Sequence, residues 1–142
     1  MEVILEVIGL VLVGFYFVFF VFWNFHFRIP CIDVIKNAHV PFPRFVFATG
    51  LIVEGLCGLL IIFEAFLLAF FPGSLFLSPY LLIVPAGVLM IFILSATFLF
   101  HRFWELEPGM VRLLNTIIFI GNFTISLSAV CFVMMLGVSW LG

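Results

Sequence analysis

Four long apolar stretches dominate the sequence and decide what the chain can fold into. They cover residues 3–23, 45–71, 80–100 and 113–138. Each supplies about the 20 residues that a helix needs to cross the ~30 Å hydrocarbon core of a bilayer. Strands of a membrane barrel would instead alternate apolar and polar residues over ~10-residue segments. The sequence therefore predicts an all-α integral membrane protein, a four-transmembrane-helix bundle that forms a single domain over residues 1–142.

The composition excludes several other classes of protein. Apolar residues make up 67% of the 142 residues and charged residues 8%, whereas a soluble domain is roughly 45–50% apolar and roughly 25% charged. The excess apolar surface must face lipid. A net charge of −2 without any run of like charges does not indicate binding to nucleic acid. The three cysteines are widely spaced and suggest neither a disulfide framework nor a metal site.

The basic residues predict how the chain is oriented in the membrane. All five lie in the first and third connections between the stretches: Arg28, Lys36, Arg44, Arg102 and Arg112. With four crossings, these two connections share one side of the membrane. The positive-inside rule would place that side in the cytoplasm and both termini outside it. The expected location is therefore a cytoplasmic (inner) membrane.

The connections are expected to hold little additional structure. In the first, over residues 24–44, a short interfacial helix is expected over residues 31–37, after which Pro41 and Pro43 would hold the chain extended. The second, over residues 72–79, reads as an uncharged turn, and the third covers residues 101–112. Pro85, in the first turns of the third helix, is expected to kink it.

Two carboxyl groups lie within the second apolar stretch. Glu54 is nine residues past Phe45, which is roughly 13 Å along a helix and close to the bilayer midplane. A charge at that depth costs ~2.5–3.5 kcal/mol, so the side chain should face the bundle interior and have a partner. It would carry protons or anchor a ligand, or it would be a neutral carboxyl that bonds a neighbouring helix. Glu64 lies ten residues further along and is expected to approach the opposite interface.

Polar residues of the last two stretches are candidate partners for Glu54. Asn122 should lie at a similar depth, since the second and fourth helices run in the same direction, and it would either orient Glu54 or act as helix–helix glue. His101 and His39 border the face that carries the basic residues. An imidazole near a carboxylate can titrate near neutral pH. Trp104 fits an aromatic belt at the interface.

Three blocks of the sequence together resemble the DoxX family of small bacterial membrane proteins. The first joins His39-Val40-Pro41-Phe42-Pro43 to Thr49-Gly50 and Glu54-Gly55-Leu56-Cys57-Gly58, the second is Ala96 to Trp104 with His101 and Arg102, and the third is Phe119-Ile120-Gly121-Asn122-Phe123-Thr124. The chain departs from the family by lacking a basic residue between its second and third helices, and members often read with cytoplasmic termini. The resemblance therefore implies an orientation opposite to the one that the charges predict.

The resemblance implies a subunit of a quinone-linked membrane redox system. By position, Glu54, His101 and Asn122 would form its catalytic polar cluster, and His39, Arg102 and Trp104 would contact a ligand, which could be a quinone. The chain has no CxxC or nucleotide-binding motif, so electrons would have to pass through quinone or another redox protein. Two other functions stay open: a non-catalytic membrane partner or assembly factor, and a minimal proton-coupled transporter that works as a homo-oligomer.

Overall fold

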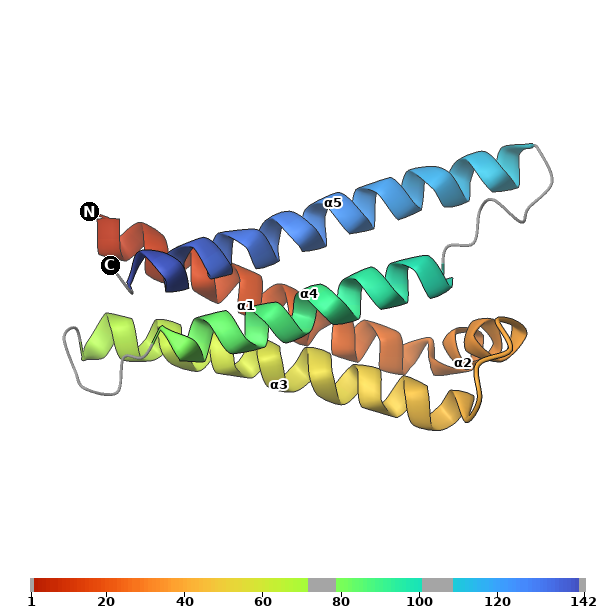
Figure 1. Cartoon of the computed structure of the whole chain (residues 1–142), viewed down its shortest axis with the longest axis horizontal. Helices are drawn as coiled ribbons and strands as arrows, with labels where there is room; N and C mark the ends of the chain where they lie inside the picture. Colours follow the sequence, from red (N-terminus) through yellow and green to blue (C-terminus); the bar gives the residue numbers. More distant parts are fainter. Residues whose placement is uncertain (1, 72–78, 101–108, 141–142) are drawn as a thin grey trace.

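The computed structural model describes residues 2–71, 79–100 and 109–140, and the regular structure in this part of the chain is helical. The helices are α1 (Glu2–His26), α2 (Arg28–Asn37), α3 (Pro43–Phe70), α4 (Tyr80–Phe100) and α5 (Met110–Ser139). Four of them, α1, α3, α4 and α5, are long and apolar enough to cross a membrane. They form one elongated bundle with α2 at one end (Figure 1). The predicted four-helix membrane bundle is confirmed.

The first connection contains more helix than the sequence predicted. Helix α1 continues to His26 instead of ending near Trp23, and Phe27 alone separates it from α2, which has ten residues. The predicted segment at 31–37 therefore belongs to a longer helix that begins at Arg28. Its Pro30 lies in the first turn, where the missing N–H of proline has no helical partner to lose. The polar residues of this region had suggested a loop, but they lie on helices near the end of the bundle.

The start of α3 differs from the prediction that Pro41 and Pro43 hold the chain extended before the helix. Pro43 is the first residue of α3, a position that suits its fixed φ, so it opens the helix rather than extending the preceding chain. The turn into the helix is made instead by Phe42, which has φ 53° and ψ 54°. His39 is also left-handed, with φ 58°. Pro85 lies in the interior of α4, and the helix continues past it to Phe100.

The described basic residues gather at one end of the bundle. Arg28 and Lys36 belong to α2, Arg44 to the first turn of α3, and Arg112 to the first turn of α5. Figure 1 shows α2 and the beginnings of α3 and α5 at the end opposite both termini. This is the common side that the charge pattern predicted. Which side faces the cytoplasm stays a prediction. Residues 72–78, where an uncharged turn was expected, and residues 101–108 lie outside the described part of the chain.

Glycines bring α1 and α3 into close contact. A Cβ on Gly14 of α1 would lie 2.5 Å from Ile62 Cγ1 and 2.8 Å from the Gly58 carbonyl oxygen of α3. A Cβ on Gly58 would lie 3.0 Å from the Gly14 carbonyl oxygen. In lipid, helices associate through such packing because the surrounding acyl chains are as apolar as the side chains. These two glycines therefore set the spacing on which the α1–α3 pair depends.

The outer faces of the four long helices are apolar. On α1, Leu10, Gly14 and Phe17 are buried at a spacing of three or four residues, whereas Leu12 and Phe15 between them are exposed. Large exposed apolar residues recur on α3, α4 and α5. In water such a continuous surface would cause association. The chain is an integral membrane protein whose exposed faces contact lipid.

Candidate functional site

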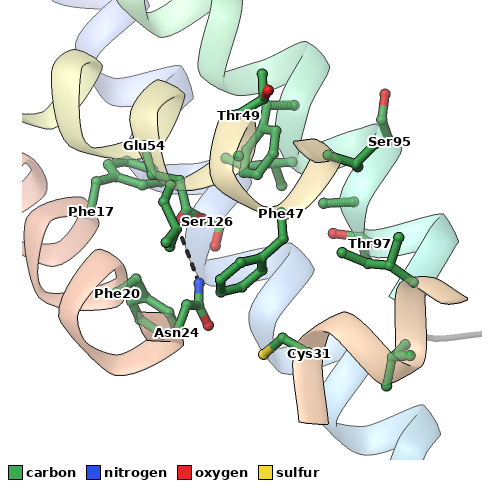
Figure 2. A pocket seen from close by; sticks show the side chains of 18 of the residues that line it. Phe17, Phe20, Asn24, Cys31, Phe47, Thr49, Glu54, Ser95, Thr97 and Ser126 are labelled. Carbon is green, nitrogen blue, oxygen red and sulfur yellow. Dashed lines mark hydrogen bonds between the residues drawn. The ribbon is translucent and has the colours of Figure 1, made fainter. Parts of the chain in front are cut away.

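A cavity of about 870 Å³ lies in the half of the bundle that α2 closes. Helices α1, α2, α3 and α4 supply most of its walls, and α5 contributes Ser126. The lining is mainly apolar and aromatic, including Phe17, Phe20, Phe47 and Phe92. Its volume falls within the ~300–1,000 Å³ that is usual for small-molecule sites. Figure 2 shows the few polar side chains that interrupt this apolar lining.

Glu54 faces this cavity from the middle of α3. It is eleven residues past Pro43, which is roughly 16 Å from the start of the helix. Asn24 of α1 donates a hydrogen bond from Nδ2 to Glu54 Oε2 over 3.3 Å. The dashed line in Figure 2 marks this bond, which joins the two side chains across the cavity. The prediction that Glu54 turns inward toward a polar partner is confirmed, but the partner seen comes from the first helix.

The sequence interpretation missed Asn24 because it ended the first helix at Trp23. With α1 continuing to His26, Asn24 lies four residues after Phe20 and seven after Phe17. This spacing places the three side chains on one face of the helix, and all three line the cavity. The spacing of Phe17, Phe20 and Asn24 was the sequence signal that could have identified Asn24 as a residue of the site. A polar residue at its end should have been assigned to the helix rather than to the loop.

Helix α2 closes the cavity from the end of the bundle. Ile35 is buried, and Cys31, one turn earlier, is half-buried and lines the cavity. Burial raises the pKa of the Cys31 thiol above its ordinary value, and the negative charge of Glu54 raises it further. Both effects disfavour the thiolate. The Cys31 thiol therefore ionises less readily at this site than a cysteine in water does.

Hydroxyl groups complete the polar lining. Tyr16 of α1 and Ser126 of α5 share a hydrogen bond of 2.9 Å between their hydroxyl oxygens, which ties these two helices together beside the cavity. Thr97 of α4 is buried, whereas Thr49 of α3 and Ser95 of α4 are exposed at the margin of the cavity. The exposed pair places part of the cavity lining at the surface of α3 and α4.

The other predicted site residues are distributed differently. His39 is exposed, and its Nδ1 lies 2.9 Å from the Asn37 carbonyl oxygen. It does not line the cavity, although its neighbour Val40 does. Asn122 belongs to α5, but its side chain lies outside the described part of the structure. His101, Arg102 and Trp104 also lie outside the described residues. Their predicted roles stay predictions.

Glu64 lies away from the cavity, and its distance from the opposite interface stays a prediction. Its side chain has 0% exposure. Because α3 continues to Phe70, Glu64 is still within the bundle, and it shares a buried face with Ile61 and Leu68. The spacing of three and four residues between these positions turns them toward the interior.

No group of three His, Cys, Asp or Glu side chains among the described residues is arranged to hold a metal ion. Comparisons with protein-family models, with curated proteins and with solved structures find no match to the chain. The proposed function therefore depends on the chemistry of the cavity and on the sequence resemblance.

Proposed function

We propose that this chain is a DoxX-like membrane subunit that serves quinone-linked redox chemistry in a bacterial cytoplasmic membrane. The observation that carries the proposal is the Glu54–Asn24 pair inside a largely apolar cavity. A quinone combines a polar ring with a long apolar tail. A largely apolar cavity with a few polar groups in its lining fits a molecule of this kind.

The residues of the cavity have separate roles in this proposal. Glu54 would accept or release a proton beside the bound ring, since a carboxyl group held within the bundle is suited to proton transfer. Asn24 would hold the carboxyl group in position. The aromatic residues of the lining would contact the ring and the first part of the tail. A bound quinone would carry the electrons, which a partner redox protein would supply or remove.

Residues that lie outside the described part keep their proposed roles. His101 would bind a carbonyl oxygen of the ring or relay protons, with Arg102 and Trp104 beside it in the sequence. Asn122 would assist in orienting Glu54. His39 is the weakest of these candidates, because its ring bonds the backbone of its own turn and is not part of the cavity lining.

The proposal is tested by the quinone that the protein retains on purification. The protein would be extracted in native-lipid discs, and its quinone content would be measured relative to phospholipid. Wild-type protein should retain more quinone than the lipid pool accounts for, and Glu54→Gln should lose the excess. Asp33→Asn is the matched control, because it makes the same change on an exposed carboxyl group of α2. An equal quinone content in all three samples would contradict the proposal.

The same preparations distinguish the other functions. A stable complex with another membrane protein that survives both Glu54→Gln and His101→Ala, without excess quinone, would favour an assembly factor or structural partner. Proton-dependent uptake by liposomes that contain the protein alone would favour a transporter. The cavity is compatible with uptake, but the described helices contain no specific feature that favours it over ligand binding.

A further inference from the structure

The acidic group that faces the cavity is the strongest hydrogen-bond acceptor in the described lining. A carboxylate is an acceptor only, and Glu54 is the acidic group in the lining. The lining among the described residues contains no lysine, arginine or histidine. Cationic side chains and imidazoles are the strong donors with which proteins bind carbonyl oxygens. The described cavity thus combines a strong acceptor with an absence of strong donors.

Several hydrogens of the neutral polar groups are already used within the protein. Asn24 directs one of its two Nδ2 hydrogens to Glu54, which leaves the second hydrogen as a donor and Oδ1 as an acceptor; Figure 2 shows this oxygen turned away from Glu54. Tyr16 and Ser126 share one hydroxyl hydrogen between them. Ser95 donates its hydroxyl hydrogen to the Ile91 carbonyl oxygen over 2.8 Å. What the described lining still offers are neutral donors: the second Nδ2 hydrogen of Asn24, the second hydroxyl hydrogen of the Tyr16–Ser126 pair, two threonine hydroxyls and a thiol.

From this arrangement we infer that the cavity selects the reduced form of its ligand, a hydroquinone, over the oxidised quinone. The inference rests on the proposed function. A hydroquinone hydroxyl donates a charge-assisted hydrogen bond to the Glu54 carboxylate, which is among the stronger bonds that proteins form. A quinone carbonyl at the same place is itself an acceptor and cannot form a hydrogen bond with the carboxylate. The desolvated carboxylate then lacks a donor from the ligand. Among the described residues, Glu54 and Asn24 are then the groups that favour the reduced form.

Asn24 acts as a positioning residue in this inference. Its bond to Oε2 fixes the carboxylate and leaves Oε1 as the oxygen that a ligand hydroxyl can reach. Its own Oδ1 is a second acceptor on the same side of the cavity. Asn24→Leu should therefore weaken the preference for hydroquinone while the carboxylate is retained, and Glu54→Gln should abolish it, since glutamine presents an N–H donor as well as an acceptor.

The test is a redox titration of a short-tailed quinone analogue in lipid discs, with the protein in excess over the analogue and in mildly alkaline buffer. A hydroquinone that binds about tenfold more tightly than the quinone raises the midpoint potential by about 30 mV relative to protein-free discs, for a two-electron couple. Glu54→Gln should return the potential to that of empty discs, and Asp33→Asn should leave it raised. The wild-type shift alone tests the inference if a variant does not fold.

Three results would overturn the inference, and they separate it from the proposed function. A lowered potential means that the quinone binds more tightly, so the selectivity is wrong while ligand binding stands. A raised potential that Glu54→Gln leaves unchanged assigns the selectivity to other residues. An unchanged potential has two explanations, which are distinguished by measuring the analogue that the discs retain after washing. Retained analogue means that both redox forms bind equally, so the selectivity is wrong. No retained analogue contradicts the proposed function as well.

Discussion

At the scale of single residues, the proposed function depends on how close Glu54 lies to the groups around it. Its charge is one of the two causes that raise the pKa of the Cys31 thiol, the larger being burial. Cys31 lies on α2, outside the membrane-spanning helices. Its reactivity therefore reports on the direction of the Glu54 side chain without any ligand. The same measurement tests whether α2 covers the cavity.

Glu54→Gln should make Cys31 react at lower pH. Removing the carboxylate removes one of the two causes that disfavour the thiolate, so the pKa of the thiol should fall toward its ordinary value while burial still holds it above that value. The measurement is the rate of alkylation by iodoacetamide against pH, in a background in which Cys57 and Cys131 are serine. Asp33→Asn serves as the control. An identical pH profile for Glu54→Gln and the background protein would mean that the two side chains are not neighbours.

Phe42 is a second residue whose conformation has a measurable cost. Its φ of 53° lies in the left-handed region, which costs an L-residue about 1–2 kcal/mol. Phe42→Gly should therefore raise the free energy of unfolding by about 0.5–1 kcal/mol. Phe45→Gly, an equally exposed phenylalanine within α3, should lower it by about 1 kcal/mol. Denaturant titrations in detergent micelles would compare the two, and a loss of stability in both would argue against the strained turn.

At the scale of helices, the sequence predicted the long elements well because hydrocarbon leaves few alternatives to a helix. The third helix was predicted at its observed bounds, residues 80–100. The ends of α1 and α3 were less certain, since interfacial residues such as Asn24 and Pro43 are polar or turn-forming and also occur within helices. Their assignment depends on tertiary packing. This is why Glu54 could be selected from the sequence but Asn24 could not.

Gly14→Ala should destabilise the α1–α3 pair. The added Cβ would overlap Ile62 and approach the backbone of Gly58, and overpacking of this kind costs about 1–3 kcal/mol. Gly87→Ala in α4 is the matched control, because a Cβ there meets nothing within 4 Å, and alanine favours a helix by about 0.5–1 kcal/mol over glycine. Thermal unfolding in micelles should separate the variants in opposite directions. Equal effects would show that α1 and α3 do not meet at these glycines.

At the scale of the whole molecule, most of the buried apolar cluster and the described basic residues lie toward opposite ends of the bundle. The buried apolar cluster that includes Leu10, Ile61 and Val133 fills the half near the termini. The cavity and the basic residues lie in the other half, toward α2. The sequence indicated this division through its charges, but the cavity depends on how five helices meet. Side-chain directions at such a junction are set by contacts distant in sequence.

The central claim is that the cavity beneath α2 holds a lipid-soluble ligand against Glu54. Photolabelling with a quinone analogue that carries a diazirine on its ring tests this directly, with the labelled peptides mapped by mass spectrometry. We expect labels within residues 16–24 and 45–54, removed by an excess of the unlabelled analogue and lost in Glu54→Gln. Labels confined to outward-facing positions such as Phe15 and Leu12, or labels that no competitor removes, would show that the ligand meets only the lipid-facing surface.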